Sequence, residues 1–273
     1  PAPRSPGPED WVGAVFVLVG AILLSAKGIY AKLLYQQGLD FITLMTVRNL
    51  LALPFFTVWG LSRSGLGHIV KAPPRVLMVT LLAGLISFYL GGIGDFYALT
   101  LIDASLERVI LFTYPAMIVL VLALRHRRWP QAQVLLGLFL TSIGIILAIG
   151  AFDAGLWQAN KVGALLVLAC AVTYAGYFFA NDYAGNRIGT RGFVFIVTTS
   201  STLVVWLHFL VVHDLGEVTL SGHAWFLLVM MTVTTTVAPV ALIAEGVRRV
   251  GAQRGALLST VGPPSTIALS ALI

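Results

Sequence analysis

The 273-residue chain has few charged residues, a single cysteine and no recognisable catalytic or nucleotide-binding motif. Charged residues make up 10% of the sequence, too little polar surface to cover a water-soluble globule. The cysteine, Cys170, lies in an apolar run, so we expect a small buried side chain without a disulfide or metal role. HExxH, GxSxG and P-loop patterns are missing. We therefore expect neither an enzyme nor a cofactor or metal, and no ATP-driven mechanism.

The chain is rich in long hydrophobic runs. Hydrophobic residues make up 58% of it, and the mean hydropathy is +0.93. Runs of about 20 apolar residues cross a hydrocarbon core about 30 Å thick, and the alternation of a membrane β-barrel is absent. The composition predicts an all-α polytopic membrane protein embedded in a lipid bilayer. Basic loops between the spans explain the net charge of +6, so no nucleic-acid partner is expected.

The apolar runs predict nine spans after a disordered lead-in at residues 1–10. The expected spans cover about residues 11–35, 41–61, 76–101, 104–124, 129–151, 162–181, 193–212, 224–245 and 256–273. The second half is shorter than the first by about one helix with its loop. We therefore expect that a tenth span of the full protein is missing from this chain.

Two internal similarities indicate a duplication. The segment FYALTLIDASLERVILFTYPAMIVLVLAL, residues 96–124, has a degraded copy at the end of the chain. A shift of 148 residues places Ala252 on Ala104 and Pro263 on Pro115. A shift of 150 residues relates the first helices of the two halves. Two similar shifts, far apart in the chain, predict one duplication of about 150 residues.

The duplication predicts two repeats, residues 11–151 and 152–273, with five helices each in the full protein. An odd number of helices makes the second repeat insert upside down relative to the first, and the substrate site is expected between them. Of the 17 lysines and arginines, twelve fall on the side of the N-terminus. The other five are Lys27, Lys32, Arg48, Arg108 and Lys161. This bias predicts a cytoplasmic N-terminus.

The chain resembles the EamA-type drug/metabolite transporter superfamily. The residues that carry the resemblance are Tyr97-Ala98-Leu99, Ala104-Ser105, Pro115, Ala252, Pro263 and Lys32. It implies a secondary transporter in a bacterial cytoplasmic membrane, with a central cavity lined by predicted helices 1, 3, 4, 6, 8 and 9. Amino-acid exporters of the YddG type belong to this superfamily, as do carriers of drugs, nucleotide sugars and sugar phosphates.

Ionisable residues within the spans are the first candidates for a binding site, because a charge in the bilayer costs a few kcal/mol. Lys27 either binds a substrate carboxylate or pairs with Asp95 or Glu107. Asp95 follows a glycine cluster that kinks its helix or admits a neighbour closely. Glu107 and Arg108, in the first turn of their helix, are expected at the outer interface. Glu245 binds substrate or pairs with the two arginines that follow it at 248 and 249.

An aromatic stripe on the sixth predicted helix is the second candidate. Its residues are spaced at i, i+3, i+4 and i+7, which places them on one face, suited to an amphipathic or aromatic substrate or to packing. The stripe and the further substrate-binding candidates of the third helix are Tyr174, Tyr177, Phe178, Asn181, Tyr89 and Tyr97.

Three prolines are candidates for hinges: Pro115, Pro239 and Pro263. A proline in the middle of a helix removes a backbone donor and costs about 3 kcal/mol unless the surroundings use the bend. The threonines before Pro239, at 232 and 234–236, are expected to bond the carbonyls that this proline frees.

Together these features predict an exporter of small metabolites, such as aromatic or other apolar amino acids, that works by alternating access. The alternatives are a carrier of another small solute (a drug, nucleotide sugar or sugar phosphate), a membrane-embedded enzyme and a non-transporting scaffold. Proton coupling and uncoupled facilitation both remain open, and a monomer is expected.

Overall fold

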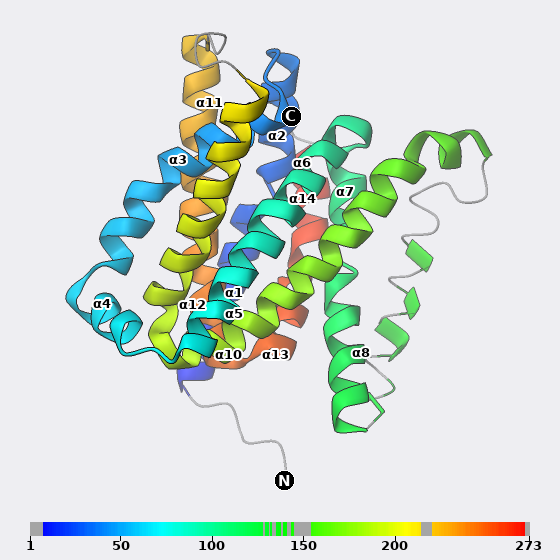
Figure 1. Ribbon diagram of the computed structural model, residues 1–273. Coiled ribbons are helices and arrows are strands. Elements are labelled where there is room, and N and C mark those ends of the chain that lie inside the picture. The colour runs from blue at the N-terminus through cyan, green and yellow to red at the C-terminus, as the bar shows by residue number, and fades with distance from the viewer. Residues whose placement is uncertain are drawn as a thin grey trace.

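The computed structural model describes residues 8–127, 154–213 and 220–270, together with 129, 130, 132, 135–137, 139, 140, 143 and 144. Every regular element within these ranges is a helix, and no strand occurs in them (Figure 1). The predicted all-α membrane class is confirmed. The lead-in at residues 1–7 and most of the span expected at 129–151 lie outside the described residues.

Many of the predicted spans consist of two helical segments. The first half contains α1 (Pro8–Leu24), α2 (Lys27–Gln36), α3 (Phe41–Gly60), α4 (Arg63–Val70), α5 (Pro74–Ala83), the π-helical η1 (Gly84–Leu90), α6 (Gly91–Leu101), α7 (Ala104–Leu111) and α8 (Tyr114–His126). The second half contains α10 (Ala154–Val212), α11 (Gly222–Thr232), the π-helical η2 (Val233–Val237), α12 (Ala238–Val250), α13 (Ala252–Leu258), the 3₁₀-helical η3 (Ser259–Val261) and α14 (Gly262–Ser270). The sequence did not predict α4, and α1 starts before the predicted Trp11.

Within the described residues, six helical stretches are long and apolar enough to cross a membrane: Trp11–Gln36, Phe41–Gly60, Pro74–Leu101, Ala104–His126, Gln158–Val212 and Gly222–Val250. The fifth contains two predicted spans. Its backbone leaves helical geometry at Gly189, with φ of +72°, a region that glycine adopts without steric cost. Consequently α10 descends through the bundle, turns at Gly189 and ascends again (Figure 1).

The two halves repeat the same series of helical segments. At the predicted shift of 148 residues, α5, η1, α6, α7 and α8 correspond to α11, η2, α12, α13 and α14. Figure 1 shows α5 and α6 running upward, whereas α11 and α12 run downward. The counterparts are therefore inverted relative to one another, as expected for two repeats with an odd number of spans.

The break between α1 and α2 has no counterpart. A shift of 150 residues places Ser25 and Ala26 on residues 175 and 176, which lie in the uninterrupted first limb of α10. The break packs against the start of α14: Ser25 Oγ donates to Gly262 O at 3.1 Å, and Thr266 Oγ1 donates to Ser25 O at 3.2 Å. Polar groups released by the break thus find partners in the other half.

Glycines allow α10 to approach η1 and α6 closely. A Cβ atom at Gly84 would lie 2.6 Å from Val197 O, and one at Gly91 would lie 2.4 Å from Thr173 Oγ1. The contact at Gly84 is with backbone, so no side-chain movement relieves it. The glycine cluster before Asp95 therefore admits a neighbouring helix, one of the two roles expected from the sequence.

Asp40 determines where α3 starts. Its carboxylate accepts hydrogen bonds from Ile42 N at 2.8 Å and Thr43 N at 3.0 Å, and it lies 3.3 Å from His213 Nε2. Burial raises the pKa of this carboxyl, but the hydrogen bonds from Thr43 and Ile42 and the charge of His213 outweigh it, so the pKa lies below its ordinary value.

We predict that Asp40→Ala destabilises the protein by about 1 kcal/mol, through loss of the helix cap. Asp40→Asn is the matched control, since it retains a capping oxygen without the charge. Because the folded pKa is lowered, the charge stabilises fully above the unfolded pKa of about 3.9, and this stabilisation disappears as the pH falls through the folded pKa. Thermal unfolding in detergent between about pH 3 and 7 measures it. A constant difference between wild type and Asp40→Asn would contradict the assignment.

Candidate functional site

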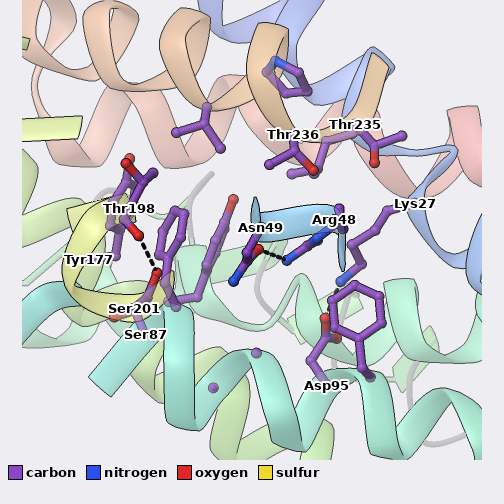
Figure 2. Close-up of a pocket in the computed structure, with 18 of the residues that line it drawn as sticks. Lys27, Arg48, Asn49, Ser87, Asp95, Tyr177, Thr198, Ser201, Thr235 and Thr236 are labelled. Carbon is purple, nitrogen blue, oxygen red and sulfur yellow. Dashed lines mark hydrogen bonds and ion pairs between the residues drawn. The ribbon is translucent and has the colours of Figure 1, made fainter. Parts of the chain in front are cut away.

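A cavity of about 110 Å³ lies between the two halves (Figure 2). Its walls come from the end of α1 and from α2, α3, η1, α6, α7, α10, η2 and α12. Both π-helical segments contribute, through Ser87 and Phe88 in η1 and through Thr235 and Thr236 in η2. Predicted helices 1, 3, 4, 6 and 8 therefore line the cavity, as expected. Predicted helices 2 and 7 also line it, whereas no described residue of predicted helix 9 does.

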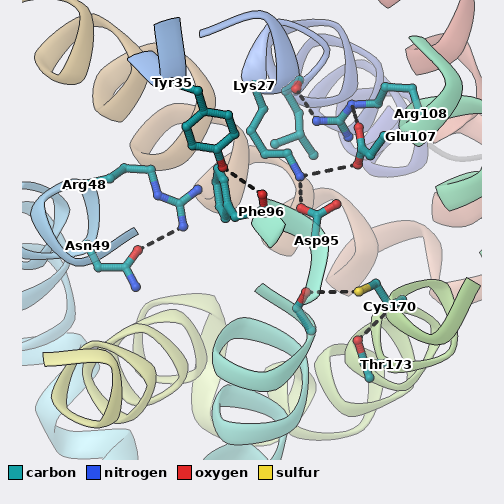
Figure 3. Close-up of polar contacts among 12 residues, drawn as sticks. Lys27, Tyr35, Arg48, Asn49, Asp95, Phe96, Glu107, Arg108, Cys170 and Thr173 are labelled. Carbon is teal, nitrogen blue, oxygen red and sulfur yellow. Dashed lines mark hydrogen bonds and ion pairs between the residues drawn. The ribbon is translucent and has the colours of Figure 1, made fainter. Parts of the chain in front are cut away.

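Four charged side chains form a buried network at one end of the cavity (Figure 3). Lys27 Nζ pairs with Asp95 Oδ2 and lies 3.6 Å from Glu107 Oε1. Arg108 Nε lies 3.4 Å from Glu107 Oε2. Each of these side chains is at most 10% exposed. Of the two roles expected for Lys27, the structure shows the ion pair, which joins α2 to α6 and α7.

The expectation that Glu107 and Arg108 lie at the outer interface is wrong. Their exposed fractions are 0% and 1%, because α2, α10 and α14 pack around α7. Arg108 also donates from Nη2 to Leu24 O at 2.9 Å, and so satisfies a carbonyl at the end of α1. The first turn of a helix lies at a membrane surface only when no other helix packs over that turn.

Arg48 is a charged residue of the cavity wall that was not among the candidates from the sequence. It was assigned to the basic residues of the outer side, yet it is 9% exposed and lines the cavity from α3. Its Nη2 donates to Asn49 Oδ1 at 3.0 Å, and its guanidinium lies 4.6 Å from the ring centre of Phe96. Among the described residues no carboxylate forms a salt bridge with it. Its position seven residues into an apolar span could have identified Arg48 as a candidate, because a charge within a span is a sign of a functional site.

The other end of the cavity carries aromatic rings and hydroxyl groups. Tyr174 and Tyr177 line it, as the stripe predicts. Tyr177 packs against Phe88 and Phe193, with ring centres 5.2 and 5.6 Å away. The hydroxyl-bearing side chains that line the cavity are Ser87, Thr173, Thr198, Ser201, Thr202, Thr235 and Thr236. The cavity thus combines a cationic end with an amphipathic wall.

Five sequence candidates lie outside the cavity. Tyr89 bonds His208 at 3.3 Å, and the ring of Tyr97 packs 5.2 Å from that of Phe41. Phe178 and Asn181 are fully buried at the contact of α10 with its neighbours, where Asn181 Nδ2 donates to Ala244 O at 2.9 Å. These side chains pack or connect helices and do not face the central space.

Glu245 is the fifth of these candidates. It receives hydrogen bonds from Arg248 and Arg249 at 2.6 to 2.8 Å and one from Thr190. It lines a separate pocket with Trp59 and Gly189, next to the turn of α10. Of the two roles expected for Glu245, the structure therefore shows the pairing with Arg248 and Arg249.

The candidate hinge prolines lie where one helical segment passes into the next. Pro115, Pro239 and Pro263 are each the second residue of a helical segment, α8, α12 and α14. Pro115 and Pro239 lie inside the helical stretches Ala104–His126 and Gly222–Val250, so the N–H that each lacks falls within a longer helix. Each proline follows a local change of helix geometry, and the hinge role stays a prediction.

The threonines before Pro239 bond differently from the expectation. Thr232, Thr234 and Thr235 donate to Leu228 O, Met230 O and Met231 O at 2.7 to 2.8 Å. These acceptors lie one turn before the threonines and are not the carbonyls that Pro239 frees. Their hydroxyls are therefore held by carbonyl groups of α11.

Three comparisons show what the chain is similar to. The model of the EamA-like transporter family matches residues 11–150 and 161–273. The "Uncharacterized transporter YcbK" of Bacillus subtilis (strain 168) is 31% identical over 277 residues, covering 97% of this chain and 86% of that protein. A crystal structure described only as that of a protein superposes with a TM-score of 0.71 at 18% identity, over 95% of this chain and 87% of the other. That last likeness concerns the fold.

We predict that Lys27→Met lowers the free energy of unfolding by about 3 to 5 kcal/mol, since it leaves buried carboxylates without their cation. The double variant Lys27→Met/Asp95→Leu should recover much of this loss, because it removes a buried charge together with its partner. Lys32→Met, at a partly exposed position of the same helix, is the control. Thermal unfolding of the purified protein in detergent measures all three. A double variant less stable than Lys27→Met would argue against the ion pair.

Proposed function

We propose that the chain, which belongs to the EamA-like transporter family, exports small apolar or aromatic amino acids across the bacterial cytoplasmic membrane by alternating access. As a member of this family it is a multi-pass membrane transporter of small solutes. The observation that carries the finer proposal is the cavity between the halves, with its cationic end and its wall of rings and hydroxyls.

The polar groups of the cavity match those of an amino acid. Arg48 supplies N–H donors for a carboxylate, and Asp95, which also lines the cavity, supplies a carboxylate for an ammonium group. The aromatic wall around Tyr177 suits an apolar or aromatic side chain. A solute with all three features uses both ends of the cavity.

The volume of the cavity favours small solutes over the larger alternatives. Pockets for drug-sized ligands occupy roughly 300 to 1,000 Å³. The central cavity has about 110 Å³. An engineered cavity of about 150 Å³ in another protein holds benzene. A nucleotide sugar is therefore a poor fit, and a small apolar amino acid is closer to the available space than an aromatic one, which needs a wider cavity than this conformation has.

The repeats provide a physical basis for alternating access. Transporters built from inverted repeats move one repeat or bundle against the other around a central site. Here the cavity lies between the halves, and the π-helical segments η1 and η2 line it from opposite repeats. π-helical turns are common at functional sites. Proton coupling and uncoupled facilitation are distinguished by transport with and without a pH gradient.

Uptake of radiolabelled amino acids into proteoliposomes tests the proposal. We expect saturable transport of apolar or aromatic amino acids, and a Tyr177→Ala variant with affinity lowered about two- to tenfold, since an aromatic contact contributes about 0.5 to 1.5 kcal/mol. Tyr97→Ala is the matched control, because Tyr97 is 42% exposed and lies outside the cavity. Absence of transport for every amino acid tested would contradict the substrate class. Unchanged affinity in Tyr177→Ala would show that the ring only packs.

The proposed orientation, with a cytoplasmic N-terminus, rests on the bias of basic residues. We predict that cysteines at Arg127 and Arg191, both exposed, react with impermeant thiol reagents only from the cytoplasmic side. The native Cys170 is buried and should react slowly, so it serves as the background. Labelling of either position in intact cells would reverse the assigned orientation.

A further inference from the structure

We propose that Arg48 is the binding site for the carboxylate group of the transported solute. The inference rests on the proposed function and assigns its substrate contact to a residue outside both the predicted stripe and the charge network. The sequence suggested Lys27 for this role. In the structure Lys27 is held by Asp95 and Glu107, whereas Arg48 lines the same cavity and forms no salt bridge with a described carboxylate.

Arg48 lies deep within the protein. It is the eighth residue of α3, so it sits about 10 Å along the helix from Phe41, at a rise of about 1.5 Å per residue. Its exposed fraction is 9%, so the side chain does not extend to a membrane surface, as lysine and arginine do near helix ends. A cation at this depth is costly without a counter-charge.

The hydrogen bonds of Arg48 leave most of its donors available. Nη2 donates to Asn49 Oδ1, its one hydrogen bond among the described residues, and the buried Nε has no acceptor. A guanidinium carries five N–H donors in a planar fork that matches the two oxygens of a carboxylate. Asn49 and the ring of Phe96 restrain the guanidinium, and Figure 2 shows it between Asn49 and Lys27 in the cavity.

Among the described residues around the cavity there is one more cation than there are carboxylates. The cations are Lys27, Arg48 and Arg108, and the carboxylates are Asp95 and Glu107. The two carboxylates are engaged by Lys27 and Arg108, so Arg48 is the surplus cation. The carboxylate of an amino acid would lie beside Arg48 and its ammonium group on the side of Asp95, so each charged group of the solute meets an opposite charge.

Three matched probes test the assignment: L-valine, 3-methylbutanoate, which lacks the amino group, and 2-methylpropan-1-amine, which lacks the carboxylate. Binding to the purified full chain is measured by ligand-induced thermal stabilisation. We expect L-valine and 3-methylbutanoate to bind wild type, with affinity at least about tenfold lower in Arg48→Gln, since hydrogen bonds to a charged group contribute about 1.5 to 3 kcal/mol. The amine should show no binding that depends on Arg48. Arg125→Gln, at an exposed arginine, is the control.

The variants also separate a binding role from a structural one. Because Arg48 forms no salt bridge with any described carboxylate, Arg48→Gln should retain or raise the melting temperature without ligand while losing the carboxylate response. Arg48→Lys retains the charge but not the planar fork, so its affinity should be intermediate. A lower melting temperature in Arg48→Gln without ligand would overturn the assignment, since it would show that Arg48 holds the fold together.

The remaining outcomes distinguish this inference from the proposed function. Transport and binding of L-valine that persist in Arg48→Gln would overturn the carboxylate site and leave the exporter intact. Binding of 3-methylbutanoate that depends on Arg48, without transport of any amino acid, would support the site and contradict the exporter. Wild type that binds neither carboxylate would overturn the inference. So would chloride alone giving the same stabilisation, because the site would then take an inorganic anion.

Discussion

Burial of charge in a low-dielectric interior is the constraint on which the rest of this structure depends. Lys27, Asp95, Glu107 and Arg108 come from three helices, and each is stable at its depth only because the others surround it. The network therefore holds α2, α6 and α7 at fixed positions beside the cavity. Arg108 adds the end of α1 through Leu24 O, so one set of charges sets the geometry of the first half.

Features that depend on local pattern could be predicted from the sequence. Apolar runs of sufficient length placed most spans, and the shift that aligns Pro115 with Pro263 also aligns the starts of α8 and α14. Lys27 and Asp95 could be identified as candidates because placing a charge within a membrane span costs free energy at any position in the span. The stripe at Tyr174 and Tyr177 followed from helical periodicity, and both residues line the cavity.

Features that depend on packing could not be predicted. Glu107 is buried because other helices cover α7. The sequence of residues 104–111 does not indicate which helices pack against it. The sequence analysis assigned Arg48 to the basic residues on one side of the membrane, because counting lysines and arginines on each side does not show how deep each lies within the bilayer. Phe178 and Asn181 share a helical face with Tyr177, yet the neighbouring helices cover them. Periodicity identifies a face, and the partner helices decide which part of it meets the cavity.

The break at Ser25 and Ala26 occurs in the first repeat and not at the corresponding position of the second, so the two halves are not equivalent. If the two inverted halves were identical, the inward-open and outward-open states would be related by symmetry and would have equal free energy. Here α1 and α2 are separated, whereas the corresponding limb of α10 is continuous. In the proposed alternating-access cycle the two end states are therefore different structures with different free energies, so the empty protein would have a preferred resting orientation.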